Sequence, residues 1–109
     1  MSVHSDISDI EELSKTLSAM TGLLRSHDLK FWADELDRCQ KIIDQSDFFG
    51  VERLLRFYGG MGSLNDVILQ GSSIFIWLDN RKFDRLRRRA YDKATALARE
   101  QPLISRRQP

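Results

Sequence analysis

Apolar side chains recur at helical spacing over roughly the first half of the chain. Ser8 to Glu11 fits a capping box, with Ser8 as the cap and Glu11 reaching back to it. The apolar positions that follow are separated by steps of three and four residues, which places them on one face of a helix. They are Ile10, Leu13, Leu17, Met20 and Leu24.

Two further helices are predicted between Asp28 and Gly59. Asp28 is the expected cap of the first, and Ser46-Asp47 are the expected caps of the second. Gly59 stands where a left-handed residue commonly ends a helix. The apolar stripes are Leu29, Trp32, Leu36, Cys39 and Ile43, with Phe31 widening the buried face, and then Phe48, Val51, Leu55 and Tyr58.

The pattern changes between Asp66 and Leu78. Residues 66–70 and 74–78 are rich in β-branched and aromatic side chains, and Gly71-Ser72-Ser73 lies between them as a turn. We predict a short β-hairpin here, which must pack on the helices to be stable. A buried helix is the alternative, because short apolar runs fit either structure.

A long final helix is predicted from the Asp79-Asn80 caps to about Glu100. Its apolar stripe is Phe83, Leu86, Ala90, Ala94 and Leu97, and Pro102 ends the pattern. The predicted fold is therefore a single, mainly α domain over residues 1–109, with about four helices and one short β-hairpin before the C-terminal helix. An all-α bundle is the alternative. The core should span about residues 8–100, with flexible ends at 1–7 and 102–109.

Composition places the chain among cytoplasmic globular proteins. Its 109 residues suffice for one core, and 41% of them are hydrophobic. The N-terminus is polar, with no apolar signal core, and no apolar run is long enough to span a membrane. Cys39 is the single cysteine, so an intrachain disulfide is impossible and a reducing compartment fits.

The charge is unevenly distributed, although the net charge is only +1. Residues 1–50 hold five Lys/Arg and ten Asp/Glu, a balance of −5, whereas residues 51–109 hold twelve and six, a balance of +6. The two halves either neutralise each other across helix faces or present two charged surfaces to partners. The candidate acidic surface for a basic partner consists of Asp34, Glu35, Asp37, Asp44 and Asp47.

A glycine-rich motif occupies the middle of the chain, and its polar members are Ser63, Asn65 and Asp66. It lacks the Lys-Ser/Thr of a phosphate-binding P-loop and follows a helix instead of a strand. We interpret it as a junction in which glycines adopt unusual backbone angles and the polar side chains bond turn amides. A polar ligand site is the alternative. Its glycines are Gly59, Gly60 and Gly62.

Enzymatic chemistry has little support in the sequence. His4 and His27 show no spacing to Cys39 that indicates a catalytic pair, and Cys39 lies on an apolar stripe, as a core thiol would. No helical pair of histidines suggests a metal site. We therefore expect no catalytic residue, no cofactor and no metal.

Basic residues crowd the start of the predicted C-terminal helix. Arg85, Arg88 and Arg89 form a candidate nucleic-acid surface, since Arg side chains neutralise phosphates. Asp84 and Asp92 interrupt the cluster, which is also typical of a solvated helix face. A small nucleic-acid-binding regulator is accordingly the alternative function.

The motif Gly59-Gly-Met-Gly-Ser-Leu-Asn-Asp66 resembles the signature of a family of small bacterial proteins of unassigned function. The segments Trp32-Ala-Asp-Glu-Leu36 and Phe83-Asp-Arg-Leu-Arg87 resemble its flanking motifs, so the resemblance covers about residues 10–98. Members are similar in size to bacterial immunity proteins. This implies a non-enzymatic protein-binding module that neutralises a cognate toxin by occluding its active site, with the acidic residues covering a basic cleft.

Overall fold

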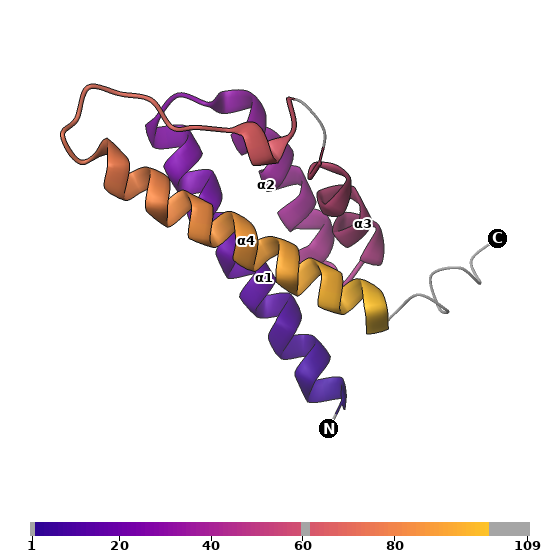
Figure 1. The fold of residues 1–109 in the computed structure, drawn as a ribbon. Coiled ribbons are helices and arrows are strands. Elements are labelled where there is room, and N and C mark those ends of the chain that lie inside the picture. Colours follow the sequence, from indigo (N-terminus) through magenta and orange to yellow (C-terminus); the bar gives the residue numbers. More distant parts are fainter. Residues whose placement is uncertain (1, 60–61, 101–109) are drawn as a thin grey trace.

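Four α-helices and one short 3₁₀ helix make up the regular structure of the computed structural model, which describes residues 2–59 and 62–100 (Figure 1). The mainly helical prediction is confirmed, and within those two ranges there is no β-strand. The elements in chain order are α1 (Ser2–Ser26), α2 (Lys30–Asp44), α3 (Phe48–Arg56), η1 (Leu64–Asp66) and α4 (Ile76–Glu100).

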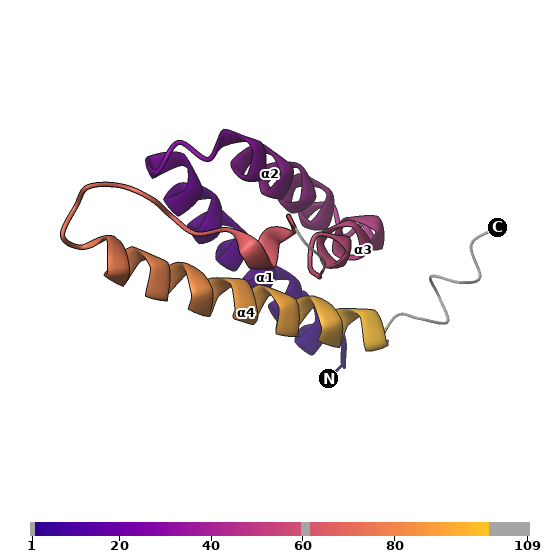
Figure 2. The ribbon, with the colours of Figure 1, turned by 45° about the horizontal axis from the view of Figure 1, so that its top comes forward.

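The predicted apolar stripes form the core. Helix α1 packs against α2 and α4, and α3 packs against the same two helices (Figures 1 and 2). Helical spacing brings the stripes of all four helices together, because residues three and four apart share a face. Leu64 and Leu69, from η1 and the segment after it, complete the core. Its fully buried members include Leu13, Leu17, Met20, Leu24, Leu36, Cys39, Leu54, Ala90 and Ala94.

The turns after α1 and α2 have the same backbone conformation. Asp28 and Ser46 have left-handed φ angles of +62° and +59°. At the first turn the amide of Leu29 donates to the carbonyl of Leu24 and the amide of Asp28 to that of Arg25, which is the Schellman pattern. The prediction that Asp28 caps α2 is therefore wrong, because Asp28 ends α1. At the second turn Asp47 does cap α3, by accepting from the amide of Phe49.

Ser46→Gly is expected to raise the free energy of unfolding by about 1 kcal/mol. A left-handed residue with a Cβ atom costs roughly 1–2 kcal/mol, which glycine avoids, and the larger entropy of glycine in the unfolded chain offsets part of the gain. Urea denaturation measures the change. Ser18→Gly, at an exposed position within α1, is the matched control and should lower stability instead. A loss of stability in Ser46→Gly would contradict this account.

The acidic and basic halves of the chain are joined by ion pairs, which confirms that their charges compensate each other across helix faces. Lys93 of α4 contacts Glu12 at 2.7 Å and Asp9 at 3.4 Å on α1. Arg53 of α3 contacts Glu35 of α2 at 3.0 Å. These pairs cross from one half to the other, so much of the charge imbalance is neutralised inside the fold.

The predicted β-hairpin is wrong, and its two expected strands have different structures. Residues 67–70 are extended beside α4, but their backbone groups bond to side chains instead of to a second strand. Residues 76–78 already belong to α4, whose first turn is capped by Ser73 through a bond from the amide of Phe75 to Ser73 Oγ. The all-α alternative fits the structure.

The starts of two helices and the burial of one side chain also differ from their predictions. Helix α1 starts at Ser2, so Ser8 lies inside it. Helix α4 starts at Ile76, so Asp79 and Asn80 lie within its first turns and bond elsewhere. Phe31 was expected in the core but is 68% exposed. The predicted flexible tail at 102–109 lies outside the described residues, and among the helices described none is long and apolar enough to cross a membrane.

Candidate partner-binding site

The segment between η1 and α4 is held in place by side chains from distant parts of the chain. It leaves η1, runs along α4 toward the start of that helix, and turns at residues 71–75 to enter it (Figure 1). Val67 is half-buried and Leu69 is buried, whereas Ile68 and Gln70 face solvent. The side chains of these residues alternate between core and solvent, as they do in a β-strand. Their backbone groups, which a neighbouring strand would bond in a sheet, bond to side chains here. We call residues 64–70, that is η1 and the extended residues that follow it, the anchored segment.

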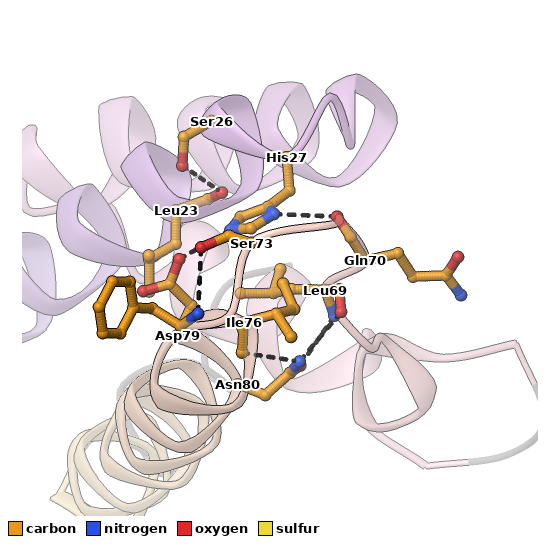
Figure 3. Close-up of polar contacts among 10 residues, drawn as sticks. Leu23, Ser26, His27, Leu69, Gln70, Ser73, Ile76, Asp79 and Asn80 are labelled. Atoms are coloured by element: carbon orange, nitrogen blue, oxygen red, sulfur yellow. Dashed lines mark hydrogen bonds and ion pairs between the residues drawn. The ribbon is translucent and has the colours of Figure 1, made fainter.

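Asn80 is the first anchor. Its Oδ1 accepts from the amide of Leu69 at 2.8 Å, and its Nδ2 donates to the carbonyl of Leu69 at 2.9 Å (Figure 3). The same Nδ2 also donates to the carbonyl of Ile76 at 3.2 Å. One carboxamide thus bonds both backbone groups of Leu69, as a neighbouring strand would.

Arg87 is the second anchor. Its Nη1 donates to the carbonyls of Leu64 and Val67 at 3.1 and 3.0 Å, and its Nη2 donates to Asp84 at 2.7 Å. The guanidinium also lies over the ring of Phe83, 5.4 Å from its centre. The Asp84 pair holds the guanidinium in place while it bonds the segment, and the hydrogen bond from Arg87 lowers the pKa of the Asp84 carboxyl.

His27 is the third anchor, and it joins the end of α1 to both the segment and α4 (Figure 3). Its Nδ1 lies 3.0 Å from the carbonyl oxygen of Gln70, and its Nε2 lies 2.9 Å from Asp79 Oδ2. Both partners only accept hydrogen bonds, so both ring nitrogens must carry protons. The imidazolium form is therefore the form that satisfies the site, and the bond to Asp79 followed by that to Gln70 raises the pKa of His27.

The His27 contacts predict a pH-dependent stability. Because the folded-state pKa lies above the ordinary value of 6.5, the stabilisation is complete below that value and is lost as pH rises through the raised pKa. We expect a loss of about 1 kcal/mol across this window, at the low end for a charged hydrogen bond because solvent screens Asp79. Urea denaturation at several pH values measures it. His27→Gln should remove this pH dependence, and an NMR titration of His27 at or below its ordinary pKa would contradict the prediction.

A group of large apolar side chains is exposed where the anchored segment meets α4. Ile74 is 78% exposed, Phe75 59%, Trp77 55% and Leu78 44%, and Ile68 on the segment is 66% exposed. Single exposed apolar residues are common, whereas a group of them is unusual on a protein surface. We call these five residues the exposed apolar surface.

The glycine-rich motif has the geometry of a junction. Gly59 and Gly62 have left-handed φ angles of +89° and +73°, as predicted for such positions. The amide of Gly62 donates to Asp66 Oδ2 at 2.7 Å, and the amide of Asn65 donates to Ser63 Oγ at 3.3 Å. Gly60 lies outside the described residues. Helix α3 ends at Arg56 with Phe57 as its C-terminal cap, so the prediction that Gly59 caps this helix is wrong. The later residues of the motif form η1.

A cleft of about 570 Å³ lies between the motif and α4. Tyr58 is half-buried beside it and donates to the carbonyl of Arg87 at 2.7 Å, and burial raises the pKa of its hydroxyl. Two of its polar groups, Tyr58 and Arg87, are therefore engaged in bonds within the chain. The rest of the lining comprises Leu55, Gly59 and Tyr91 together with four polar side chains, Asn65, Arg88, Asp92 and Thr95.

The five predicted partner-binding carboxylates are not brought together on one surface. Asp34 pairs with Arg25 at 3.2 Å and Asp44 accepts from Ser14 at 2.6 Å, so both lie on the side of α2 that faces α1. Glu35 lies on the side that faces α3, where it pairs with Arg38 and Arg53 and is 14% exposed. Asp37 pairs with Lys41 at 3.3 Å, and Asp47 caps α3.

The three arginines of the predicted nucleic-acid surface differ in their surroundings. Arg88 pairs with Asp84 at 3.2 Å and Arg89 with Glu12 at 3.8 Å, so carboxylates partly neutralise them. Arg85 is exposed and has no ion-pair partner among the described residues.

The described residues show little that suggests catalysis. Burial raises the pKa of the Cys39 thiol to about 11, which keeps it protonated and unreactive at neutral pH. Within the part of the chain that the structure describes, no three His, Cys, Asp or Glu side chains are placed to hold a metal ion. His27 is engaged in anchoring the segment.

Sequence reasoning missed the exposed apolar surface and the anchors. The apolar density of residues 74–78 was visible in the sequence, but it was assigned to a packed hairpin. The available signal was the position of these residues directly before a strongly charged helix, with a capping serine at position 73.

Comparison with known proteins gives one match. Residues 25–74 match the model of a family described as a domain of unknown function, DUF6966. The matched range covers less than half of the chain and runs from the end of α1 through α2, α3 and η1 to the turn before α4. No curated protein and no solved structure matches the chain. The family description names no activity.

Proposed function

We propose that this chain is a non-enzymatic protein-binding module that docks its partner through the exposed apolar surface. The observation that carries the proposal is the exposure of Ile74, Phe75, Trp77 and Leu78, each 44% or more, at one end of the molecule. Burying one such side chain on binding contributes about 1.5–3 kcal/mol, so the group has enough apolar area for a stable complex.

The anchors support this proposal because they hold the surface in one conformation before binding. Ser73 caps the turn that carries Phe75, and Asn80 and His27 fix the chain on either side of that turn. A preorganised surface loses less conformational entropy on association than a mobile loop would. Side chains that served only to cover the core would be buried.

The specific form that we propose is a bacterial immunity protein that neutralises a cognate toxin by covering its active site. Small size and the resemblance of the glycine-rich motif support this form. The geometry gives the acidic residues of α2 a smaller part than the sequence suggested, because Asp34, Glu35 and Asp44 already have partners within the chain.

A comparison of captured proteins tests the binding proposal. Wild-type chain, a Phe75→Ser/Trp77→Ser variant and a Phe49→Ser control are immobilised and exposed to nuclease-treated bacterial lysate. Phe49 is also an exposed aromatic residue, 47% exposed, but it lies on α3, at the opposite end of the molecule from the turn before α4 (Figure 1). We expect a protein held by the wild type and the control to be lost with the double variant. Identical captures by all three, or none by the wild type, would count against the proposal.

The immunity form has its own test. Co-expression of the chain with a toxic domain encoded beside its gene should restore growth, and the Phe49→Ser control should do the same. The Phe75→Ser/Trp77→Ser variant should fail, provided that its thermal unfolding is unchanged. Growth restored equally by all three chains would show that protection does not depend on the exposed apolar surface.

A further inference from the structure

The exposed apolar surface continues into a row of cations along the same face of α4. Ile74, Trp77, Arg81, Arg85 and Arg88 follow one another at steps of three and four residues, which is the spacing of one helix face. All five are exposed to solvent. The opposite face carries Phe83, Ala90, Ala94 and Leu97, which are buried in the core.

Two carboxylates lie near this row. Asp79 bonds His27, whereas Asp84 bonds Arg87 and Arg88, the last member of the row. Arg81, Lys82 and Arg85 are exposed and have no ion-pair partner within residues 9–59 and 62–100. Arg81 and Arg85 therefore present unpaired positive charge beside the apolar side chains.

We infer that the partner presents an apolar pocket bordered by a track of carboxylates. This inference rests on the proposed protein-binding function and specifies its partner. Trp77 and Phe75 would fill the pocket, and the carboxylates would face Arg81 and Arg85. Charge complementarity of this kind speeds association and excludes partners of the wrong sign.

Other macromolecules fit this surface less well. Three of the five members of the exposed apolar surface, Ile68, Ile74 and Leu78, are aliphatic and offer no stacking to nucleic-acid bases, which leaves only Phe75 and Trp77 for that role. On a lipid surface the apolar turn would enter first, and Arg85 lies eight residues beyond Trp77, roughly 12 Å along the helix. The headgroup layer of one leaflet is only about 5–8 Å deep. A protein surface can match the full length of the row.

Selection from a library of random displayed peptides tests the inference. Peptides that bind the immobilised wild-type chain are selected, and those that also bind the Trp77→Ser variant are removed. We expect enrichment of peptides that combine aromatic or aliphatic side chains with Asp and Glu. Enrichment of basic peptides, or no enrichment, would overturn the inference.

The affinity of one synthesised peptide from this selection then separates the two proposals. Trp77→Ser and Arg81→Glu/Arg85→Glu should each weaken binding at least about tenfold, and added salt should weaken binding to the wild type. The control Arg56→Glu/Arg99→Glu changes two exposed arginines on α3 and at the far end of α4, and it should bind like the wild type. Each variant is first shown by thermal unfolding to be folded.

Each contrary result has a distinct meaning. Loss of binding with Trp77→Ser but none with Arg81→Glu/Arg85→Glu would overturn the acidic partner and leave the protein-binding proposal standing. No dependence on Trp77 would overturn both. Trp77-dependent binding to vesicles of phosphatidylcholine and phosphatidylserine, without acidic peptides from the selection, would replace the protein partner with a lipid surface.

Discussion

Arg87→Met is expected to lower the free energy of unfolding by about 2 kcal/mol, because it removes a donor that two backbone carbonyls share. The Arg87 side chain is 13% exposed and bonds the carbonyls of Leu64 and Val67. The carbonyl of Leu64 keeps a bond from the amide of Val67 at 3.2 Å, so the carbonyl of Val67 is the one that loses its donor. A buried carbonyl left without a donor costs about 1–3 kcal/mol, and methionine keeps a contact with the ring of Phe83. Urea denaturation measures the loss, and the pKa of Asp84, followed by NMR, should rise toward its ordinary value in the variant.

Arg88→Met is the matched control for this prediction. Arg88 is the next residue and pairs with the same carboxylate, Asp84, but its side chain is 78% exposed. Exposed ion pairs contribute little, so the change in stability should stay below about 0.5 kcal/mol. Similar losses in the two variants would show that the pair with Asp84, and not the bonds to the anchored segment, accounts for the effect.

Asn80→Leu is expected to lower the free energy of unfolding by about 2–3 kcal/mol. Leucine has the branched shape of asparagine, although it is larger, and it bonds neither backbone group of Leu69, which is buried. Two unsatisfied backbone groups account for the estimate. The loss should be local, so the amide of Leu69 should exchange with solvent much faster than the amides of α1.

Asn80→Asp separates the two halves of that contact. The carboxylate still accepts from the amide of Leu69, but it cannot donate to the carbonyl of Leu69. Its stability should lie between those of the wild type and Asn80→Leu. Unchanged exchange at Leu69 in both variants would contradict the anchoring role of Asn80.

The helices could be predicted from the sequence because their information is local. Spacings of three and four residues identify the buried stripes of α1 and α4 whatever the rest of the chain does. The positions of the helix ends were predicted less accurately, because several residues near each end have side chains that could act as the cap. Asp28 has a side chain suited to capping α2, yet its left-handed backbone ends α1.

The extended segment shows what a local pattern leaves open. Val67, Ile68 and Leu69 are all apolar, yet in the structure Leu69 is buried and Ile68 exposed, as in a strand. The local pattern does not identify what bonds the backbone between them. That partner is Asn80, eleven residues further along, together with His27 and Arg87, which the fold alone brings near.

The sequence indicates which kinds of side chain the candidate site could use, but not which of them lie together in the fold. Their neighbouring positions in the sequence suggest that Asp34 and Glu35 belong to one acidic surface, whereas Asp34 pairs with Arg25 of α1 and Glu35 pairs with Arg53 of α3. The apolar run that contains Trp77 predicts a packed hairpin, because apolar side chains usually pack. In the structure this run enters α4, where Ile76 packs against the core and Trp77 is 55% exposed.

The positions of the anchors along the chain also give its assembly an order. Two of the three, Asn80 and Arg87, follow the anchored segment, so a chain made from its N-terminus presents residues 64–70 before their partners exist. Until then water must bond those backbone groups. We predict that pulse-labelled hydrogen exchange protects the amide of Leu69 after those of the α1–α2 pair, and simultaneous protection would refute this order. The end of the molecule that carries Trp77 is therefore completed only once Asn80 and Arg87 have been made.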